Sequence, residues 1–255
     1  MSLTITLVQS NLHWEAIDTN IAMFDQKLCD LPHTDVVILP EMFSTGFSMN
    51  VKPIAETMEG KAVKWMRATA QKINAALTGS LIIEENGAYY NRLLWVEPDG
   101  TMHQYDKKHL FSMAEEDRSF SAGKERIIID YKGWKIAPFI CYDLRFPVWA
   151  RNTVDYDIAF YVANWPQKRS HHWKSLLVAR AIENQAYVFG VNRVGVDGSG
   201  FEYSGDTTAL DPAGTLLYQK SHEEAIHTFT ISKEHLTDVR KRLPFLNDRD
   251  SFVMT

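Results

Sequence analysis

The sequence contains few cysteines, prolines and glycines, and it has no long apolar run. Its 9 prolines and 13 glycines among 255 residues are too few for a fibrous, disordered or linker-dominated chain. No stretch approaches the roughly 18 to 20 consecutive apolar residues that a membrane helix needs, so no membrane partner is expected. The two cysteines, Cys29 and Cys141, allow at most one disulfide, and a core of this size should not need one.

An excess of positive charge is also missing. The chain has 27 Lys and Arg against 32 Asp and Glu, well mixed along its length, with a formal net charge of -5. Without a basic stripe that attracts phosphate groups, nucleic acid is not an expected partner. The first eight residues read as a strand that ends at the polar Gln9, and this apolar run is too short for a secretory signal. We therefore expect a cytoplasmic protein.

Strands and amphipathic helices alternate along the chain. Apolar residues three and four positions apart predict helices from Ile21 to Leu31 and from Val63 to Leu77, the second closed by Gly79, and a third helix is expected over 173–185. The expected strands span 4–8, 35–41, 80–83, 89–96, 101–105, 135–141, 156–163, 187–192, 207–210, 216–219 and 225–231. About ten strands and four or five helices, with antiparallel hairpins among them, indicate an α/β protein.

The chain is interpreted as a single domain over residues 1–255. No change of composition, linker rich in Pro, Gly or Ser, or internal repeat divides it. The tail over 244–255 mixes aromatic with charged residues. We expect this tail to dock on a partner subunit.

Cys141 stands where a buried apolar strand gives way to the polar turn that begins at Tyr142. A rigid strand can hold a thiol at such an end so that the thiol faces a substrate. A small core residue is an equally good interpretation, because free cysteine is among the most buried residue types. Cys29, on the flank of a predicted helix, is interpreted as a packing residue.

A reactive thiol needs a base or a cation beside it, and histidine is the usual choice. None of the nine histidines stands at an obvious strand end with an Asn or Asp to orient it, so a Cys–His pair is possible but without support. His171 and His172 cannot point the same way on a helix and read as a solvated helix start. No spacing typical of metal ligands occurs, so no metal site is predicted.

Two charged residues are better placed than the histidines. Glu41 ends the apolar strand over 36–40, where a buried carboxylate becomes a usable general base. Lys107 follows the hairpin strand that passes through Tyr105. Lys107 and Lys108 face opposite sides of an extended chain, so only one can point inward. Taken alone, a pair of adjacent lysines is better interpreted as part of the solvated surface.

Three motifs together resemble a known family. Residues 39–47 (LPEMFSTGF), 105–111 (YDKKHLF) and 141–147 (CYDLRFP) resemble, in order, the Glu, Lys and Cys motifs of the nitrilase superfamily of carbon–nitrogen hydrolases. The resemblance continues through 164–166 (NWP), 179–184 (ARAIEN) and 192–195 (NRVG), and so covers nearly the whole chain. It implies an αββα sandwich of two mixed sheets between helix layers, commonly paired as a homodimer, and an enzyme without cofactors.

The resemblance also implies roles for individual residues. Cys141 would be the nucleophile, Glu41 the base that takes its proton, and Lys107 the cation that stabilises the oxyanion, with the backbone N–H of Tyr142 as a second donor. The family has a further glutamate seven residues before a glycine. Counting back from Gly123 gives Glu116, although the adjacent Glu115 remains open; this residue would hold Lys107 and position the substrate.

Within the superfamily the chain looks most like the omega-amidase branch. This implies hydrolysis of a small 2-oxo acid with a terminal amide, such as 2-oxoglutaramate or 2-oxosuccinamate, to a dicarboxylate and ammonia. Arg145 is a candidate partner for the substrate carboxylate, or else forms a structural ion pair with a carboxylate such as Asp143. Phe47 and Trp165 either wall the pocket or belong to the core.

Two alternatives to the omega-amidase reading stay open. The first is an amidase of the same superfamily that acts on N-carbamoyl amino acids or deaminated glutathione, because pocket loops rather than the triad decide the substrate. The second is a non-catalytic binding member, which the presence of all three triad positions disfavours.

Overall fold

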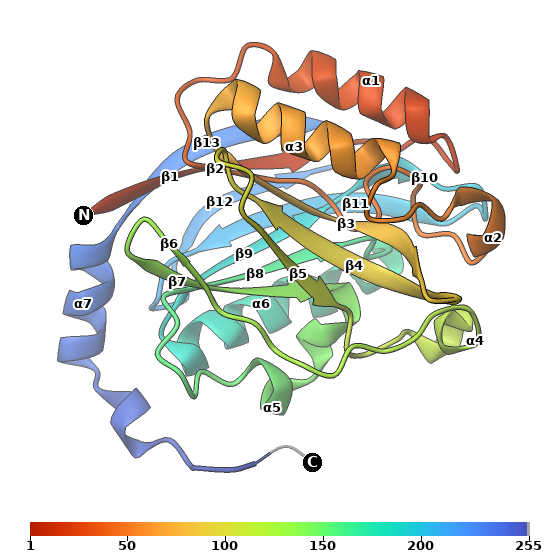
Figure 1. Cartoon of the computed structure of the whole chain (residues 1–255). Helices are drawn as coiled ribbons and strands as arrows, with labels where there is room; N and C mark the ends of the chain where they lie inside the picture. The colour runs from red at the N-terminus through yellow and green to blue at the C-terminus, as the bar shows by residue number, and fades with distance from the viewer. Residues whose placement is uncertain (254–255) are drawn as a thin grey trace.

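A computed structural model describes residues 1–253 and consists of two β-sheets between layers of helices (Figure 1). The first sheet has six strands in the order β13-β1-β2-β3-β4-β5, and the second has seven, in the order β10-β11-β9-β8-β7-β6 with β12 paired to β11. The first sheet comprises β1 (Ser2–Gln9), β2 (Val36–Ile38), β3 (Ala76–Glu85), β4 (Ala88–Val96), β5 (Met102–Asp106) and β13 (Ala225–Ser232). The second comprises β6 (Ile129–Tyr131), β7 (Trp134–Ile140), β8 (Ile158–Ala163), β9 (Tyr187–Asn192), β10 (Val194–Val196), β11 (Glu202–Leu210) and β12 (Leu216–Ser221).

Helices cover the outer faces of both sheets. Figure 1 shows α1 and α3 side by side above the first sheet, with α5 and α6 beyond the second. The α-helices are α1 (Ile17–Leu28), α2 (Val51–Ile54), α3 (Lys61–Ile73), α4 (Glu116–Ser119), α5 (Pro147–Ala150), α6 (Ser170–Asn184) and α7 (Lys233–Arg242), and the 3-10 turns are η1 (Ser112–Ala114), η2 (Cys141–Arg145), η3 (Gln167–Arg169) and η4 (Phe245–Asp248). This arrangement confirms the αββα sandwich of two mixed sheets.

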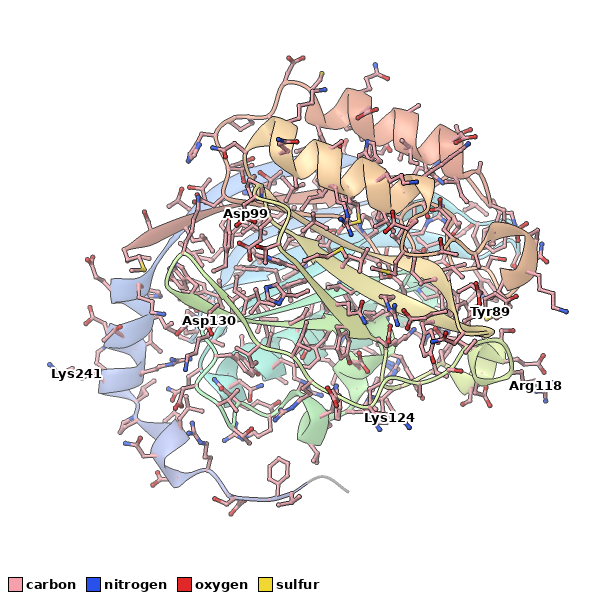
Figure 2. The ribbon with its side chains drawn as sticks, in the orientation of Figure 1. Tyr89, Asp99, Arg118, Lys124, Asp130 and Lys241 are labelled. Atoms are coloured by element: carbon pink, nitrogen blue, oxygen red, sulfur yellow. The ribbon has the colours of Figure 1, made fainter. Side chains whose placement is uncertain are left out.

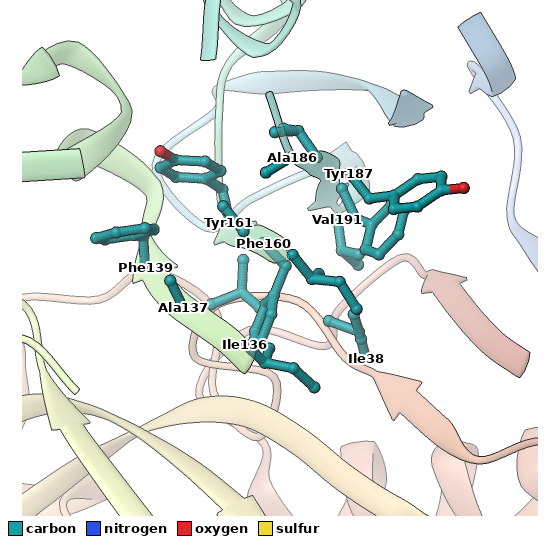
Figure 3. Packing of buried hydrophobic residues seen from close by; sticks show 14 of the residues in the cluster. Ile38, Ile136, Ala137, Phe139, Phe160, Tyr161, Ala186, Tyr187 and Val191 are labelled. Atoms are coloured by element: carbon teal, nitrogen blue, oxygen red, sulfur yellow. The ribbon is translucent and has the colours of Figure 1, made fainter. Parts of the chain in front are cut away.

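The pattern of β2 shows why its sequence is apolar without interruption. Val36 and Ile38 belong to the core between the sheets, whereas Val37 and Leu39 belong to the core under α1 and α3. A strand buried on both faces needs apolar side chains at every position. Figure 3 shows part of the core between the sheets, with Ile38 near residues of the second sheet such as Phe160.

The carboxyl ends of parallel strands meet at one edge of each sheet. β1, β2 and β3 run parallel in the first sheet, as do β7, β8 and β9 in the second. β4 and β5 return antiparallel, as expected for the hairpin over 89–105.

Charged side chains such as Asp99, Arg118 and Lys241 lie at the outside of the molecule (Figure 2).

Three local expectations were wrong. The first predicted helix was expected to reach Leu31, but α1 ends at Leu28. Helix α3 ends at Ile73, because Asn74 adopts a left-handed conformation with φ 52, and the chain then enters β3. Leu77 and Gly79 are therefore strand residues, and Gly79 lies where a Cβ would come within 2.9 Å of the Phe43 ring. Cys29 is exposed rather than packed, because α1 ends at Leu28 and the turn that follows lies at the surface.

The tail packs partly on its own chain. Leu246 is buried, and its backbone N–H donates to Gln185 Oε1 over 3.3 Å, while Phe245 and Phe252 remain exposed. Residues 254–255 of the tail lie outside the described residues. Within 1–253, none of the helices is both long enough and apolar enough to cross a membrane.

Candidate active site

Cys141 lies at the carboxyl end of β7, in the first position of turn η2. Its φ is 41, a left-handed conformation that is strained for a residue other than glycine and is typical of functional sites. The buried carboxylate of Asp143 holds this turn, because it accepts from the Ile140 N–H over 3.0 Å and from the Tyr105 hydroxyl over 2.7 Å. The strand and this carboxylate together fix the direction of the thiol, whose Sγ lies 4.0 Å from the Asn164 carbonyl oxygen.

Glu41 and Lys107 meet beside Cys141, although they come from different strands. Glu41 follows β2, Lys107 follows β5, and Lys107 Nζ lies 2.9 Å from Glu41 Oε1 with both side chains completely buried. The other oxygen of Glu41, Oε2, accepts from the Asn164 backbone N–H over 2.7 Å. Lys108 lies on the other side of the chain, with its Nζ 5.4 Å from the Trp149 ring.

A second buried carboxylate, that of Glu116 at the start of α4, contacts Lys107. Its oxygens lie 3.0 and 2.9 Å from Lys107 Nζ. The neighbouring Glu115 is exposed and pairs with Arg118 over 2.6 Å, so Glu116 is the glutamate that reaches the lysine. Gly123 N–H donates to the Lys107 carbonyl over 2.9 Å, and a Cβ on this glycine would lie 2.0 Å from a backbone oxygen, so the close approach requires glycine.

Burial and mutual charge set the protonation of this cluster. Burial alone would lower the pKa of Lys107, but the carboxylates of Glu116 and Glu41 outweigh it and raise that pKa above its ordinary value. Burial, and then the charge of Glu41, raise the pKa of the Cys141 thiol well above its usual range, against the opposing effect of Lys107. The resting cysteine is therefore a thiol, and its proton has to move to a base when the sulfur attacks. Burial also raises the pKa of Glu116.

Cys141 lies in a cavity of about 490 Å³. Arg145 and Arg169 line this cavity, with the Arg145 guanidinium 4.7 Å from the Trp165 ring and the Arg169 guanidinium 5.1 Å from the Phe111 ring. The remaining lining residues are Trp14, Phe47, Met49, Lys107, Met113, Ala114, Glu115, Tyr142, Asn164, Pro166, Asp197, Ser199, Phe201 and Tyr203. Phe47 and Trp165 both line the cavity, and Trp165 also belongs to the core between the sheets.

Arg145 has no ion-pair partner within residues 1–253, so the expected alternative of a pair with Asp143 is wrong. Asp143 instead binds His109, whose Nδ1 lies 2.8 Å from its Oδ1. Arg145 has a polar neighbour in His172, 3.2 Å away. Burial, and then the nearby charge of Arg169, lower the pKa of Arg145, as expected when two guanidinium groups lie near each other.

Sequence reasoning did not single out Asn91 or Arg169. It also did not predict that Asn164 donates hydrogen bonds to Glu41. Asn164 comes directly after the buried strand β8, and a polar residue at such a strand end is a signal that the sequence does carry. Asn91 and Arg169 have no comparable signal. In the described part of the chain no group of three or more His, Cys, Asp or Glu residues is placed to hold a metal ion, and no histidine lines the cavity of Cys141.

Comparison with known proteins places the chain among enzymes that cleave carbon–nitrogen bonds. Residues 10–241 match the carbon-nitrogen hydrolase family. The chain is 46% identical to omega-amidase YafV of Escherichia coli K12 over 98% of both chains, and 34% identical to the 2-oxoglutaramate amidase of Bacillus subtilis over 97% of this chain and 98% of that one. The crystal structure of XC1258 from Xanthomonas campestris, a CN-hydrolase superfamily protein with an arsenic adduct in its active site, superimposes over all of both chains with a TM-score of 0.98 and 43% identity. Nit3 of Saccharomyces cerevisiae, at 24% identity over 95% of this chain and 94% of that one, has the same fold with a TM-score of 0.85.

Proposed function

Because the chain belongs to the carbon-nitrogen hydrolase family, within the nitrilase superfamily, we propose that it is an omega-amidase. It hydrolyses the terminal amide of small 2-oxo dicarboxylate monoamides, such as 2-oxoglutaramate and 2-oxosuccinamate, to the dicarboxylate and ammonia. The observation that carries the proposal is the buried cluster of Glu41, Lys107 and Glu116 beside Cys141. The omega-amidase and 2-oxoglutaramate amidase relatives support the choice of substrate.

The reaction begins when Cys141 Sγ attacks the amide carbon and its proton passes to Glu41. Lys107 and the Tyr142 backbone N–H stabilise the negative charge that forms on the amide oxygen. The carbon–nitrogen bond then breaks, Glu41 returns the proton to the leaving nitrogen, and ammonia departs from a thioester. Glu41 next takes a proton from water, which attacks the thioester and releases the carboxylic acid, with the proton returned to the sulfur. Glu116 holds Lys107 in place throughout.

Arg145 and Arg169 bind the carboxylate at the other end of the substrate. Two guanidinium groups that line one cavity repel each other unless an anion lies between them. Each group lies near an aromatic ring, which helps to keep its N–H donors directed into the cavity. A planar carboxylate suits such donors, because it can accept two hydrogen bonds from one guanidinium. Phe47 and Trp165 form apolar parts of the wall around a short substrate.

Ammonia release in the steady state tests the proposal. Turnover of 2-oxoglutaramate and 2-oxosuccinamate is compared with turnover of N-carbamoyl amino acids and deaminated glutathione, the substrates of the alternative function. We expect the 2-oxo amides to give the highest kcat/KM, and a folded Cys141→Ala variant to release no ammonia above background. If 2-oxoglutaramate were not hydrolysed, the proposed substrate would be wrong, and an active Cys141→Ala variant would remove the mechanism.

The chain also forms a homodimer in the cytoplasm in this proposal, with no nucleic acid as partner. Support comes from the apolar side chains that the tail leaves exposed, Phe245 and Phe252, beside the buried Leu246. Light scattering after size-exclusion chromatography is expected to give twice the mass of 29.2 kDa. A double Phe245→Ser, Phe252→Ser variant should shift the monomer–dimer equilibrium toward the monomer. A wild-type protein with the mass of a monomer would refute the dimer.

A further inference from the structure

Asn91, on β4, lies at the centre of the buried charged cluster. Its side chain is completely buried, and its backbone carbonyl oxygen accepts from the Lys107 backbone N–H over 3.0 Å, so the two residues are neighbours across adjacent strands. Its amide nitrogen Nδ2 lies 2.8 Å from Glu41 Oε1 and 3.3 Å from Glu116 Oε1. One neutral side chain therefore donates to both carboxylates that flank the lysine.

The amide oxygen of Asn91 lacks a partner among the described residues, and this indicates that the side chain is present for its N–H donors. Oδ1 is buried and has no hydrogen-bond partner among residues 1–253. An unpaired buried carbonyl is unfavourable, and an apolar side chain of the same size, such as leucine, would avoid it. Turning the amide over would place Oδ1 against two carboxylate oxygens, which is worse. The observed orientation is the one in which the N–H groups serve ionised carboxylates.

We propose that Asn91 is a positioning residue that keeps Glu41 and Glu116 ionised and directed around Lys107, so that Glu41 is ready to take the proton of Cys141. Lys107 contacts the same two carboxylates, but a single ammonium cannot neutralise both. With Cys141 as a thiol, two carboxylates and one ammonium leave a net charge of -1 in a completely buried site. Asn91 adds N–H donors without adding charge, and so it opposes the uptake of a proton by the pair.

The groups that face Asn91 define the expected pH dependence. They are Glu41 after β2, Lys107 after β5, Glu116 on α4 and, beyond Glu41, Cys141 in η2. The two carboxylates share the donors of Lys107 and Asn91. Hydrogen bonds to the ionised form of a carboxylate oppose its protonation. Removing the donor therefore moves the acid limb of activity to higher pH.

The experiment compares the pH dependence of kcat/KM for 2-oxoglutaramate in the wild type and in Asn91→Leu. This readout rests on the proposed function. We expect the acid limb to move up by about one pH unit, the size expected for one charge-assisted hydrogen bond in a buried site. Asn152→Leu is the matched control, because Asn152 is also completely buried and donates to two backbone carbonyls, but it lies away from the cavity. That control should lower the melting temperature and leave the acid limb in place.

A second variant and a second readout keep the test decisive. Asn91→Ala leaves room for water if leucine prevents folding, and it should move the limb in the same direction by a smaller amount. The rate of Cys141 alkylation by iodoacetamide follows the same proton, because Glu41 must be ionised to accept it, and this measurement needs no turnover. An acid limb and an alkylation profile unchanged in both variants would overturn the proposal for Asn91. If the wild type failed to hydrolyse 2-oxoglutaramate while the alkylation profile moved as expected, only the proposed substrate would be wrong.

Discussion

Replacing Lys107 by methionine tests whether the ammonium is what makes two adjacent buried carboxylates tolerable. Methionine keeps the length of the side chain and removes its charge. Lys107 makes ion pairs with Glu41 and Glu116 at 2.9 Å, and all three side chains are completely buried. Removing one partner from a buried pair leaves an uncompensated charge, which costs about 3 to 5 kcal/mol when the carboxylates stay ionised. We expect that loss in the free energy of unfolding at pH 8.

The loss of unfolding free energy in Lys107→Met should be smaller at lower pH, and this pH dependence is the sharper test. The pKa of Glu116 is already raised by burial, and the charge of Lys107 opposes that rise, so the variant raises the pKa further. A carboxyl group whose pKa is higher in the folded than in the unfolded chain binds a proton on folding, so stability falls as the pH rises between the two values. Uptake of one such proton changes the difference in unfolding free energy between the wild type and the variant by about 1.4 kcal/mol per pH unit. The loss of stability caused by Lys107→Met should therefore be smaller at pH 5.5 than at pH 8.

Urea unfolding at pH 5.5, 7 and 8, followed by tryptophan fluorescence, measures both quantities. Lys108→Met is the matched control, because Lys108 is adjacent in sequence but only partly buried, and it should change stability by less than about 1 kcal/mol. Adding Glu116→Gln to Lys107→Met should restore part of the stability at pH 8, since it removes one of the two charges. A destabilisation that is equal at all three pH values, or no larger than that of Lys108→Met, would refute the reasoning.

Three further predictions concern the walls and supports of the site. Arg145→Gln and Arg169→Gln should each raise KM for 2-oxoglutaramate by about tenfold or more with a smaller effect on kcat, and should leave turnover of an amide without a carboxylate unchanged; equal losses on both substrates would argue against a carboxylate site. Tyr105→Phe removes the hydroxyl that donates to Asp143 over 2.7 Å. It should lower the free energy of unfolding in urea by about 1 to 2 kcal/mol and should also lower kcat. An unchanged kcat would show that the turn of Cys141 does not need this hydrogen bond. Gly123→Ala should destabilise by at least about 2 kcal/mol, since its Cβ would lie 2.0 Å from a backbone oxygen, whereas Gly100→Ala, at a site with open space and φ 91, should lose only about 1 kcal/mol; similar values for the two would contradict the role of close approach.

Cys141 and Glu41 could be singled out because each follows a buried strand, whereas Lys107 was singled out by its resemblance to the Lys motif of the nitrilase superfamily. Cys141 follows β7 and Glu41 follows the run that contains β2, and both runs are apolar enough to be recognised in the sequence. The spacing from Gly123 narrowed the second glutamate to two neighbours. Only the ion pair with Lys107 separates buried Glu116 from exposed Glu115, since this choice depends on how the loop after β5 returns.

Local boundaries were less predictable, because single residues decide them. The apolar phase of α3 continues past its end to Leu77, and the left-handed conformation of Asn74 interrupts it. Cys29 lies close to an apolar stripe and is nevertheless exposed, because the helix stops one residue earlier. Periodicity reports which residues are apolar, but not which turn of the chain ends a helix.

The sequence by itself determined the α/β class, because the hydrophobic period is a local property of the chain. Its three motifs, by their resemblance to the nitrilase superfamily, indicated the family and the three reactive residues. The tertiary structure decided how these residues act on one another. It brings Lys107 to Glu41 across 66 positions and Asn164 to Glu41 across 123, it places the amide of Asn91 against both carboxylates, and it leaves Arg145 and Arg169 facing a cavity. Protonation and substrate charge depend on such distances through space, and no spacing along the chain contains them.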